Sequence, residues 1–239
     1  AGREMPGYDP LVQALGGLMS ITGPPDAPSK TGVAIVDVVA GLYATVAVLA
    51  ALRERESSGR GQRVAINLLH TALATLANQA TGYLATGQVP ARLGNDHPSI
   101  APFSTYRAAD GDLMIGVGND RQFTSLCDAI GAGGVAADRR FAQNSSRVAH
   151  AAELREAIER HLAARSCAEW TELLLAADVP AGPVLDVANA FELAQRLGLD
   201  VVDDVGGVRT VRFPATLSRT PAATRRRPPV LGGDDAAAA

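Results

Sequence analysis

The sequence predicts a mixed α/β protein made of two parts. Three observations support this: a helix, strand, helix order over the first 87 residues, a polar connection rich in proline and glycine over residues 88–102, and a hairpin followed by helices after it. The chain has 239 residues, of which 47% are hydrophobic, so it is long and apolar enough to bury a core. We therefore expect a folded chain.

The first part centres on one long apolar helix. Residues 38–55 follow an acidic residue, run through good helix formers and end in charged residues before Gly59 and Gly61. We expect this helix to be mostly buried. Residues 63–69 then alternate apolar and polar side chains as a strand does, and residues 69–86 show helical spacing. This order is typical of an α/β layer.

The second part begins with a predicted β-hairpin. Residues 103–118 form two apolar runs around Asp110-Gly111, a strong turn signal. Capping residues and apolar spacing after the hairpin predict three helices and an extended segment, followed by a short helix after residue 188 and a strand. The ranges are 120–130, 150–164 and 167–177 for the three helices, 179–186 for the extended segment and 208–213 for the strand.

Composition excludes several functions. The net charge of −3 provides no basic field for nucleic acid, which favours a small-molecule partner. Cys127 and Cys167 lie far apart and the four histidines lack ligand spacing, so neither a disulfide framework nor a metal site is expected. The longest uncharged apolar run, residues 38–52, is shorter than the ~20 residues of a membrane span, and no signal-peptide core is present at the start. We expect a cytoplasmic protein without membrane contact.

Asp37 is the residue most indicative of chemistry. It is the lone charged residue between Thr31 and Leu52, directly before the long apolar helix. The commoner role for such a residue is a helix N-cap, in which the carboxylate accepts a hydrogen bond from the first turn. The alternative role is a nucleophile, because a helix N-terminus that favours an ionised carboxylate also presents it to an electrophile. The two roles are compatible.

Several ordered segments resemble the class III CoA-transferase family, of the carnitine and formyl-CoA transferase type. The resemblance covers nearly the whole chain, through residues 8–69, 94–123, 180–187 and 219–233. In that family the acid of a G-x-x-x-x-D segment is the catalytic aspartate, and Gly32 to Asp37 occupies this position. The resemblance therefore implies that Asp37 forms covalent aspartyl anhydride and aspartyl-CoA thioester intermediates.

The same resemblance implies the architecture and the partners. We expect a partial Rossmann-like large domain (1–87), a linker (88–102), a small α+β domain (103–187) and a C-terminal segment (188–239) that returns to the large domain. An interlocked homodimer is implied, with acyl-CoA and small carboxylic acids as substrates. Coenzyme A is then a substrate, and no further cofactor is expected.

Three further residues are candidates by family position. Gly94 and Asn95 are expected to donate backbone N–H groups to the oxyanion, although an ordinary interdomain turn remains an alternative. His97 would contact the acyl carboxylate or assist proton transfer, and a structural histidine is the commoner alternative. Asp120 occupies the segment where related racemases place a glutamate, but an N-cap for the following helix is the simpler interpretation.

Family members have a nucleotide-binding half before the position of Tyr8, and no glycine-rich phosphate loop replaces it here. We therefore expect this polypeptide alone to bind CoA poorly and to transfer no acyl group. Two alternatives remain open: a 2-methylacyl-CoA racemase, and a non-catalytic dimerisation fragment. The sequence does not indicate the acyl groups.

Overall fold

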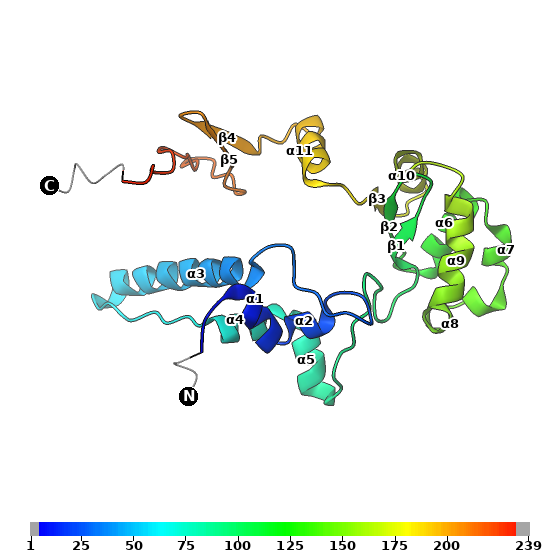
Figure 1. Ribbon diagram of the computed structural model, residues 1–239, viewed down its shortest axis with the longest axis horizontal. Coiled ribbons are helices and arrows are strands. Elements are labelled where there is room, and N and C mark those ends of the chain that lie inside the picture. The colour runs from blue at the N-terminus through cyan, green and yellow to red at the C-terminus, as the bar shows by residue number, and fades with distance from the viewer. Residues whose placement is uncertain (1–4, 233–239) are drawn as a thin grey trace. The chain divides into compact units, whose positions relative to one another are not determined.

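The computed structural model describes residues 5–232 and divides into two compact units, Ala1–Gly182 and Pro183–Ala239. The first unit begins with helices only and continues with a three-stranded sheet and its own helices (Figure 1). The opening helices are α1 (Asp9–Leu15), α2 (Leu18–Ile21), α3 (Ile35–Ser58), α4 (Leu68–Thr75) and α5 (Ala77–Thr86).

Helix α3 confirms the predicted long helix and extends it at both ends. Its C-cap is Gly59, whose positive φ of 68° suits glycine and whose N–H donates to the carbonyl of Arg55. The expected burial is wrong, because only Val36 and Ala40 of this helix are buried. Helices α1 and α4 pack against one side of α3, beside its first turns (Figure 1). Most of its remaining apolar residues are exposed within this unit, and a few, such as Val39, are half-buried.

The length of α3 also corrects the expectation, based on the uncharged run alone, that this segment is too short to cross a membrane. The helix has 24 residues, and an 18-residue window within it has a mean hydropathy of 2.2. By length and composition it is able to cross a membrane, although the 15-residue run of residues 38–52 was too short. The difference arises because the helix already begins at Ile35, so Ile35, Val36 and Asp37 precede the uncharged run within the same helix, and the charged residues 53–56 lengthen it further.

The strand predicted over residues 63–69 is wrong. This segment is irregular up to Asn67, whose side chain accepts a hydrogen bond from the backbone N–H of His70 and caps α4. Alternation alone does not produce a strand, because a strand needs a neighbour for its ladder and the described residues before 103 contain none. The predicted helix over 69–86 is present but broken into α4 and α5 at Ala77, which has a φ of 47°.

The opening helices enclose a small core. It is made of Val12, Leu18, Val36 and Ala72, with partly buried apolar neighbours around it. Val12 of α1 and Val36 of α3 are both in this cluster, so apolar packing joins the two helices independently of any polar contact. None of the described residues before the sheet forms a strand, so a Rossmann-like layer is not seen in them.

The predicted hairpin is confirmed. Strands β1 (Phe103–Arg107) and β2 (Asp112–Gly116) pair antiparallel, from Phe103 opposite Gly116 to Arg107 opposite Asp112. Strand β3 (Ala181–Pro183) completes a sheet of order β1-β2-β3. It confirms only a short part of the extended segment predicted over 179–186.

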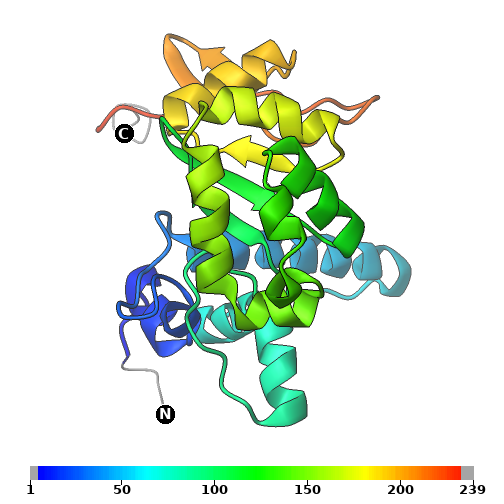
Figure 2. The ribbon, with the colours of Figure 1, turned by 90° about the vertical axis from the view of Figure 1, so that its right-hand side faces the viewer.

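The helices of the small α+β part also follow the prediction. The three predicted helices are α6 (Asp120–Ala129), α9 (Ala151–Leu162) and α10 (Cys167–Ala176), and three short ones were not predicted: α7 (Gly133–Ala136), α8 (Asn144–Ala149) and the 3₁₀ helix η1 (Arg139–Phe141). Helices α6 and α9 lie over one face of the sheet (Figure 2).

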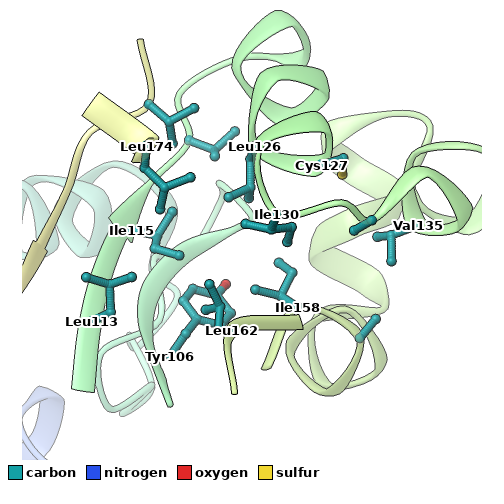
Figure 3. Packing of buried hydrophobic residues seen from close by; sticks show 14 of the residues in the cluster. Tyr106, Leu113, Ile115, Leu126, Cys127, Ile130, Val135, Ile158, Leu162 and Leu174 are labelled. Atoms are coloured by element: carbon teal, nitrogen blue, oxygen red, sulfur yellow. The ribbon is translucent and has the colours of Figure 1, made fainter. Parts of the chain in front are cut away.

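This part of the chain has a closed apolar core. Leu113 and Ile115 of β2 meet Leu126 of α6, Ile158 of α9 and Leu174 of α10, and all five are fully buried (Figure 3). Alternate residues of β2 face the core, as the period of a strand requires. The core fixes the hairpin and therefore the position at which the loop before it enters the sheet.

The second unit contains α11 (Val187–Arg196) and an antiparallel pair, β4 (Val202–Val205) and β5 (Val208–Val211). Strand β5 confirms the prediction near 208–213, whereas β4 was missed. The boundary after Gly182 lies close to the predicted limit at 187, and the first unit includes both the 1–87 and the 103–182 segments. The predicted return of residues 188–239 to the large domain stays a prediction.

Candidate functional site

Asp37 lies in the first turn of α3, where its side chain is exposed. The helix begins at Ile35, so the N-cap position belongs to Ala34, which has no side chain able to cap. The N-cap interpretation of Asp37 is therefore wrong. Among residues 5–232 no donor makes a hydrogen bond to its carboxylate. Both of its oxygens are available to a substrate.

The cap of α3 is supplied from another helix, by Asp9. One carboxylate oxygen, Oδ1, accepts hydrogen bonds from the backbone N–H groups of Val36 at 2.8 Å and of Asp37 at 3.3 Å. Asp9 is only 4% exposed although it carries a carboxylate. A buried carboxylate requires such partners, because an unpaired one would be strongly destabilising. Asp9 thereby replaces the missing local N-cap.

The other oxygen of Asp9 is held by Gln13, one turn further along α1. Gln13 Nε2 donates to Asp9 Oδ2 at 2.6 Å, and Gln13 Oε1 accepts the backbone N–H of Thr31 at 3.0 Å. Gln13 is fully buried. The Thr31 hydroxyl in turn donates to the carbonyl of Val33 at 2.8 Å. Two buried polar residues of α1 thus hold both the start of α3 and the segment that leads into it.

The loop before α3 is fixed at its other end by Arg92. Its guanidinium donates to three backbone carbonyls, those of Ser20, Pro24 and Pro25, at 3.4, 3.2 and 3.0 Å. Two residues later, the backbone N–H of Gly94 donates to the carbonyl of Gly23 at 3.1 Å. The linker before the hairpin is therefore attached to the turn that precedes Asp37.

The two predicted oxyanion donors differ in their geometry. Gly94 has a φ of 61°, which suits glycine, but its N–H is already bonded to Gly23. The side chain of Asn95 donates to the Thr105 hydroxyl at 2.9 Å, and its backbone N–H has no acceptor in the part of the chain that the structure describes. Asn95 is therefore the free donor of the pair. The role in the reaction stays a prediction.

His97 is held by local contacts. Its Nδ1 accepts the backbone N–H of Ser99 at 3.2 Å, and its ring lies 5.3 Å from the ring of Phe103. A cavity of about 150 Å³ lies beside it, with Asp96 and Arg155 also in its lining. No acid contacts the His97 ring among the described residues, which favours the structural role.

The polar groups of that cavity are engaged with each other. Arg155 donates to Asp96 and to the Thr105 carbonyl, and to the Ser104 hydroxyl at 2.9 Å. Its guanidinium lies 4.9 Å from the centre of the Tyr106 ring. Tyr106 is buried, and burial raises the pKa of its phenol. These contacts hold the end of the 88–102 linker that leads into strand β1.

The N-cap interpretation of Asp120 was wrong by one residue. Asn119 is the N-cap of α6, accepting the N–H of Gln122 at 2.9 Å, and Asp120 follows it in the first turn. The carboxylate of Asp120 instead pairs with Arg147 at 2.6 Å. Asp120 is therefore already committed to an ion pair and is not positioned as an isolated base.

Sequence reasoning missed the residues that position the site, namely Asp9, Gln13, Arg92 and Arg147. Three of them are helical and Arg92 lies in the irregular connection before the hairpin, and each makes at least one hydrogen bond to a partner 18 or more residues away. No metal-binding group of three His, Cys, Asp or Glu residues occurs among the residues described. The Gly94 loop is bonded to Gly23, in the segment that leads to α3, and no hydrogen bond joins it to Asp37 itself among the residues described; His97 lies with Asp96 and Arg155.

The sequence pattern of CoA-transferase family III matches residues 1–235. The chain is 41% identical to the succinate–glutarate CoA-transferase of Agrobacterium fabrum, over 96% of this chain and 59% of that protein. It is 38% identical to the acetyl-CoA:oxalate CoA-transferase of Acetobacter aceti, over 89% of this chain and 55% of that protein. The crystal structure of a CAIB/BAIF family protein from Brucella suis superposes with a TM-score of 0.90 at 39% identity, covering all of this chain and 63% of that one.

A mixed helix and strand fold, with an aspartate that is unpaired among the described residues in the first turn of a long apolar helix, thus coincides with a match to one enzyme family over residues 1–235. The chain belongs to CoA-transferase family III. It spans 59% and 55% of the length of the two curated relatives named above.

Proposed function

We propose that the protein containing this chain transfers CoA from an acyl-CoA to a carboxylic acid, with Asp37 as the nucleophile. The observation that supports this most directly is the uncommitted carboxylate of Asp37 in the first turn of α3. Because Asp9 already caps α3, the Asp37 carboxylate is not needed as the helix cap. The relatives are named for CoA transfer involving succinate, glutarate or oxalate, which favours small carboxylic acids as substrates.

The reaction divides one exchange into four attacks. The Asp37 carboxylate attacks the thioester carbonyl, forming a C–O bond and breaking the C–S bond, which gives a mixed anhydride and CoA thiolate. The thiolate attacks the aspartyl carbonyl and releases the donor acid as a carboxylate. The acceptor carboxylate attacks the resulting aspartyl thioester and releases the thiolate again. Finally the thiolate attacks the acyl carbonyl of the acceptor, which forms the new acyl-CoA and restores Asp37.

No proton is gained or lost in this sequence, so no general base is required. Each attack places negative charge on a carbonyl oxygen, and a backbone N–H that is already oriented stabilises it. Asn95 is the proposed donor, because its backbone N–H is free whereas that of Gly94 is bonded to Gly23. His97 is proposed to shape the adjacent cavity.

The remaining features of the proposal concern the assembly. We propose an interlocked homodimer in which the exposed apolar face of α3 is covered by protein. A Rossmann-like part is proposed for the portion of the relatives' length that this chain does not span. Burial of this face against protein would explain the high hydropathy of α3 without a membrane. We propose that the enzyme is cytoplasmic. Coenzyme A is a substrate, and no other cofactor is proposed. The 239 residues expressed alone are expected to bind CoA poorly and to transfer no acyl group, because they span only 59% and 55% of the two relatives named above and have no glycine-rich phosphate loop.

Trapping of the intermediate tests the proposal. The complete protein is incubated with an acyl-CoA donor and then treated with hydroxylamine, which converts an activated aspartyl group to a hydroxamate. Peptide mass analysis is expected to locate the hydroxamate on Asp37, and Asp37→Ala is expected to abolish both the adduct and turnover. Asp26→Ala, an exposed acid in the loop before α3, is the matched control and keeps both. An active protein that gives no adduct on Asp37 would exclude the mechanism.

A further inference from the structure

We propose that Asp9 is a positioning residue for Asp37, acting through the backbone of the first turn of α3. This inference rests on the proposed function, because it assigns to Asp9 the task of orienting the nucleophile. The geometry that supports it is the pair of hydrogen bonds from Val36 and Asp37 to one oxygen of a buried carboxylate.

The cap acts directly on the reacting residue. One of the two N–H groups that Asp9 accepts belongs to Asp37 itself, so the Cα of Asp37 is held from α1, 28 residues earlier in the chain. A helix whose N-cap is Ala34 would otherwise have frayed first-turn N–H groups. Fraying would move Asp37, and a displacement of about 1 Å at a reacting group lowers rates by about 100-fold.

The side chain of Asp37 takes no part in the cap. An acid at the third position of a helix commonly turns back to the N-cap backbone, as in a capping box. Here the first-turn N–H groups of Val36 and Asp37 are occupied by Asp9, and the Asp37 carboxylate accepts no bond among residues 5–232. The nucleophile is thus free at its carboxylate while Asp9 holds its backbone.

Gln13 gives the cap its rigidity. It fixes the second oxygen of Asp9 at 2.6 Å and bonds Thr31 N–H through its own carbonyl oxygen. The orientation of the Asp9 carboxylate is thus determined by a fully buried neighbour. Rotation of either side chain would break bonds on both sides, so the start of α3 and its approach segment have one arrangement.

The packing between α1 and α3 does not depend on this cap. Val12 and Val36 are both in the apolar core of the opening helices. A variant that lacks the cap can therefore keep the contact between the helices while the first turn of α3 loosens. This separates a positioning role from a purely structural one.

The experiment measures the rate at which Asp37 becomes acylated in the complete protein, by hydroxylamine trapping at millisecond to second times, together with kcat and KM for the acyl-CoA. Asp9→Ala is expected to lower the trapping rate and kcat by about 10- to 100-fold, with KM changed less than about threefold. Asp9→Asn keeps an acceptor oxygen for the two N–H groups but cannot satisfy Gln13 as a carboxylate does. The trapping rate and kcat of Asp9→Asn are expected to recover most of the loss seen in Asp9→Ala, remaining about 3- to 10-fold below wild type. Asp26→Ala is the control and stays at the wild-type rate.

Folding is checked by circular dichroism and thermal unfolding of each variant. If Asp9→Ala does not fold, the positioning role is tested with Asp9→Asn and Gln13→Met. Both variants are expected to lower the trapping rate. Wild-type trapping rates in the folded variants overturn the positioning role and leave the proposed function intact. Absence of an Asp37 adduct in the wild-type protein instead overturns the proposed function itself.

Discussion

The carboxylate of Asp110 accepts the backbone N–H of Cys167 at 2.7 Å, joining the turn of the β1-β2 hairpin to the start of α10. The residue that makes the hairpin turn favourable thus also stabilises a helix 57 residues later in the chain. Hydrogen bonding from Cys167 is the main cause that holds the pKa of Asp110 below its usual value.

Removing this carboxylate is expected to destabilise the protein in a pH-dependent way. Because the folded pKa is lowered, the stabilisation is present above the unfolded pKa of about 3.9 and is lost as pH falls through the folded pKa. Asp110→Ala should therefore lower the melting temperature near pH 7, and the difference from wild type should shrink below about pH 4. Asp112→Ala, which removes an exposed pair with Arg107, is the control and should have little effect at either pH. A pH-independent difference would contradict the assignment.

Arg147 is expected to be among the most sensitive residues of the small α+β part. It is 1% exposed and donates to the carbonyls of Ala101 and Phe141 at 2.7 and 3.1 Å, with its guanidinium over the ring of Phe123. Arg147→Met would leave two buried carbonyls without donors, at about 1–3 kcal/mol each. Urea unfolding should show this loss.

The control for Arg147 is Arg140→Met. Arg140 pairs with Asp138 at the surface, and its contribution to the free energy of unfolding should be small. Equal losses in the two variants would show that the buried hydrogen bonds of Arg147 are not what stabilises this region.

The elements that the sequence predicted correctly are those whose causes are local. Ser166 caps helix α10 with a complete capping box to Glu169, and the β1-β2 turn is set by Asp110-Gly111. Such signals lie within a few residues. Their predictions were therefore accurate to one or two residues.

The errors arise where a distant partner decides the outcome. Residues 63–69 alternate like a strand but have no neighbour to pair with, and α3 is apolar yet mostly exposed in this chain. Asp37 was expected directly before the long helix, but it lies within the first turn of α3, and its expected cap role belongs to Asp9. A capping residue 27 positions before Val36 leaves no local pattern, so no reading of spacing would have found it.

The two cysteines are expected to resist alkylation while the protein is folded. Both are free and buried, and burial raises the pKa of the Cys127 and Cys167 thiols to about 11. At pH 8 roughly one thiol in a thousand would be ionised, and only the thiolate reacts. Iodoacetamide at pH 8 should therefore modify neither cysteine in native protein and both in urea, as read by intact mass. Rapid modification of native protein would show that the core around α6 and α10 opens easily.

The exposed face of α3 provides the test of the proposed dimer. Leu42 and Val46 are one turn apart on this helix and are 62% and 64% exposed, so they lie on the same uncovered side. If a second copy covers this face in the complete protein, Leu42→Glu with Val46→Glu would bury two charges in the interface, and light scattering should show monomers. Leu175→Glu, on an exposed position of α10, is the control and should leave the dimer intact. A wild-type monomer, or a double variant that remains dimeric, would show that α3 does not form the dimer contact.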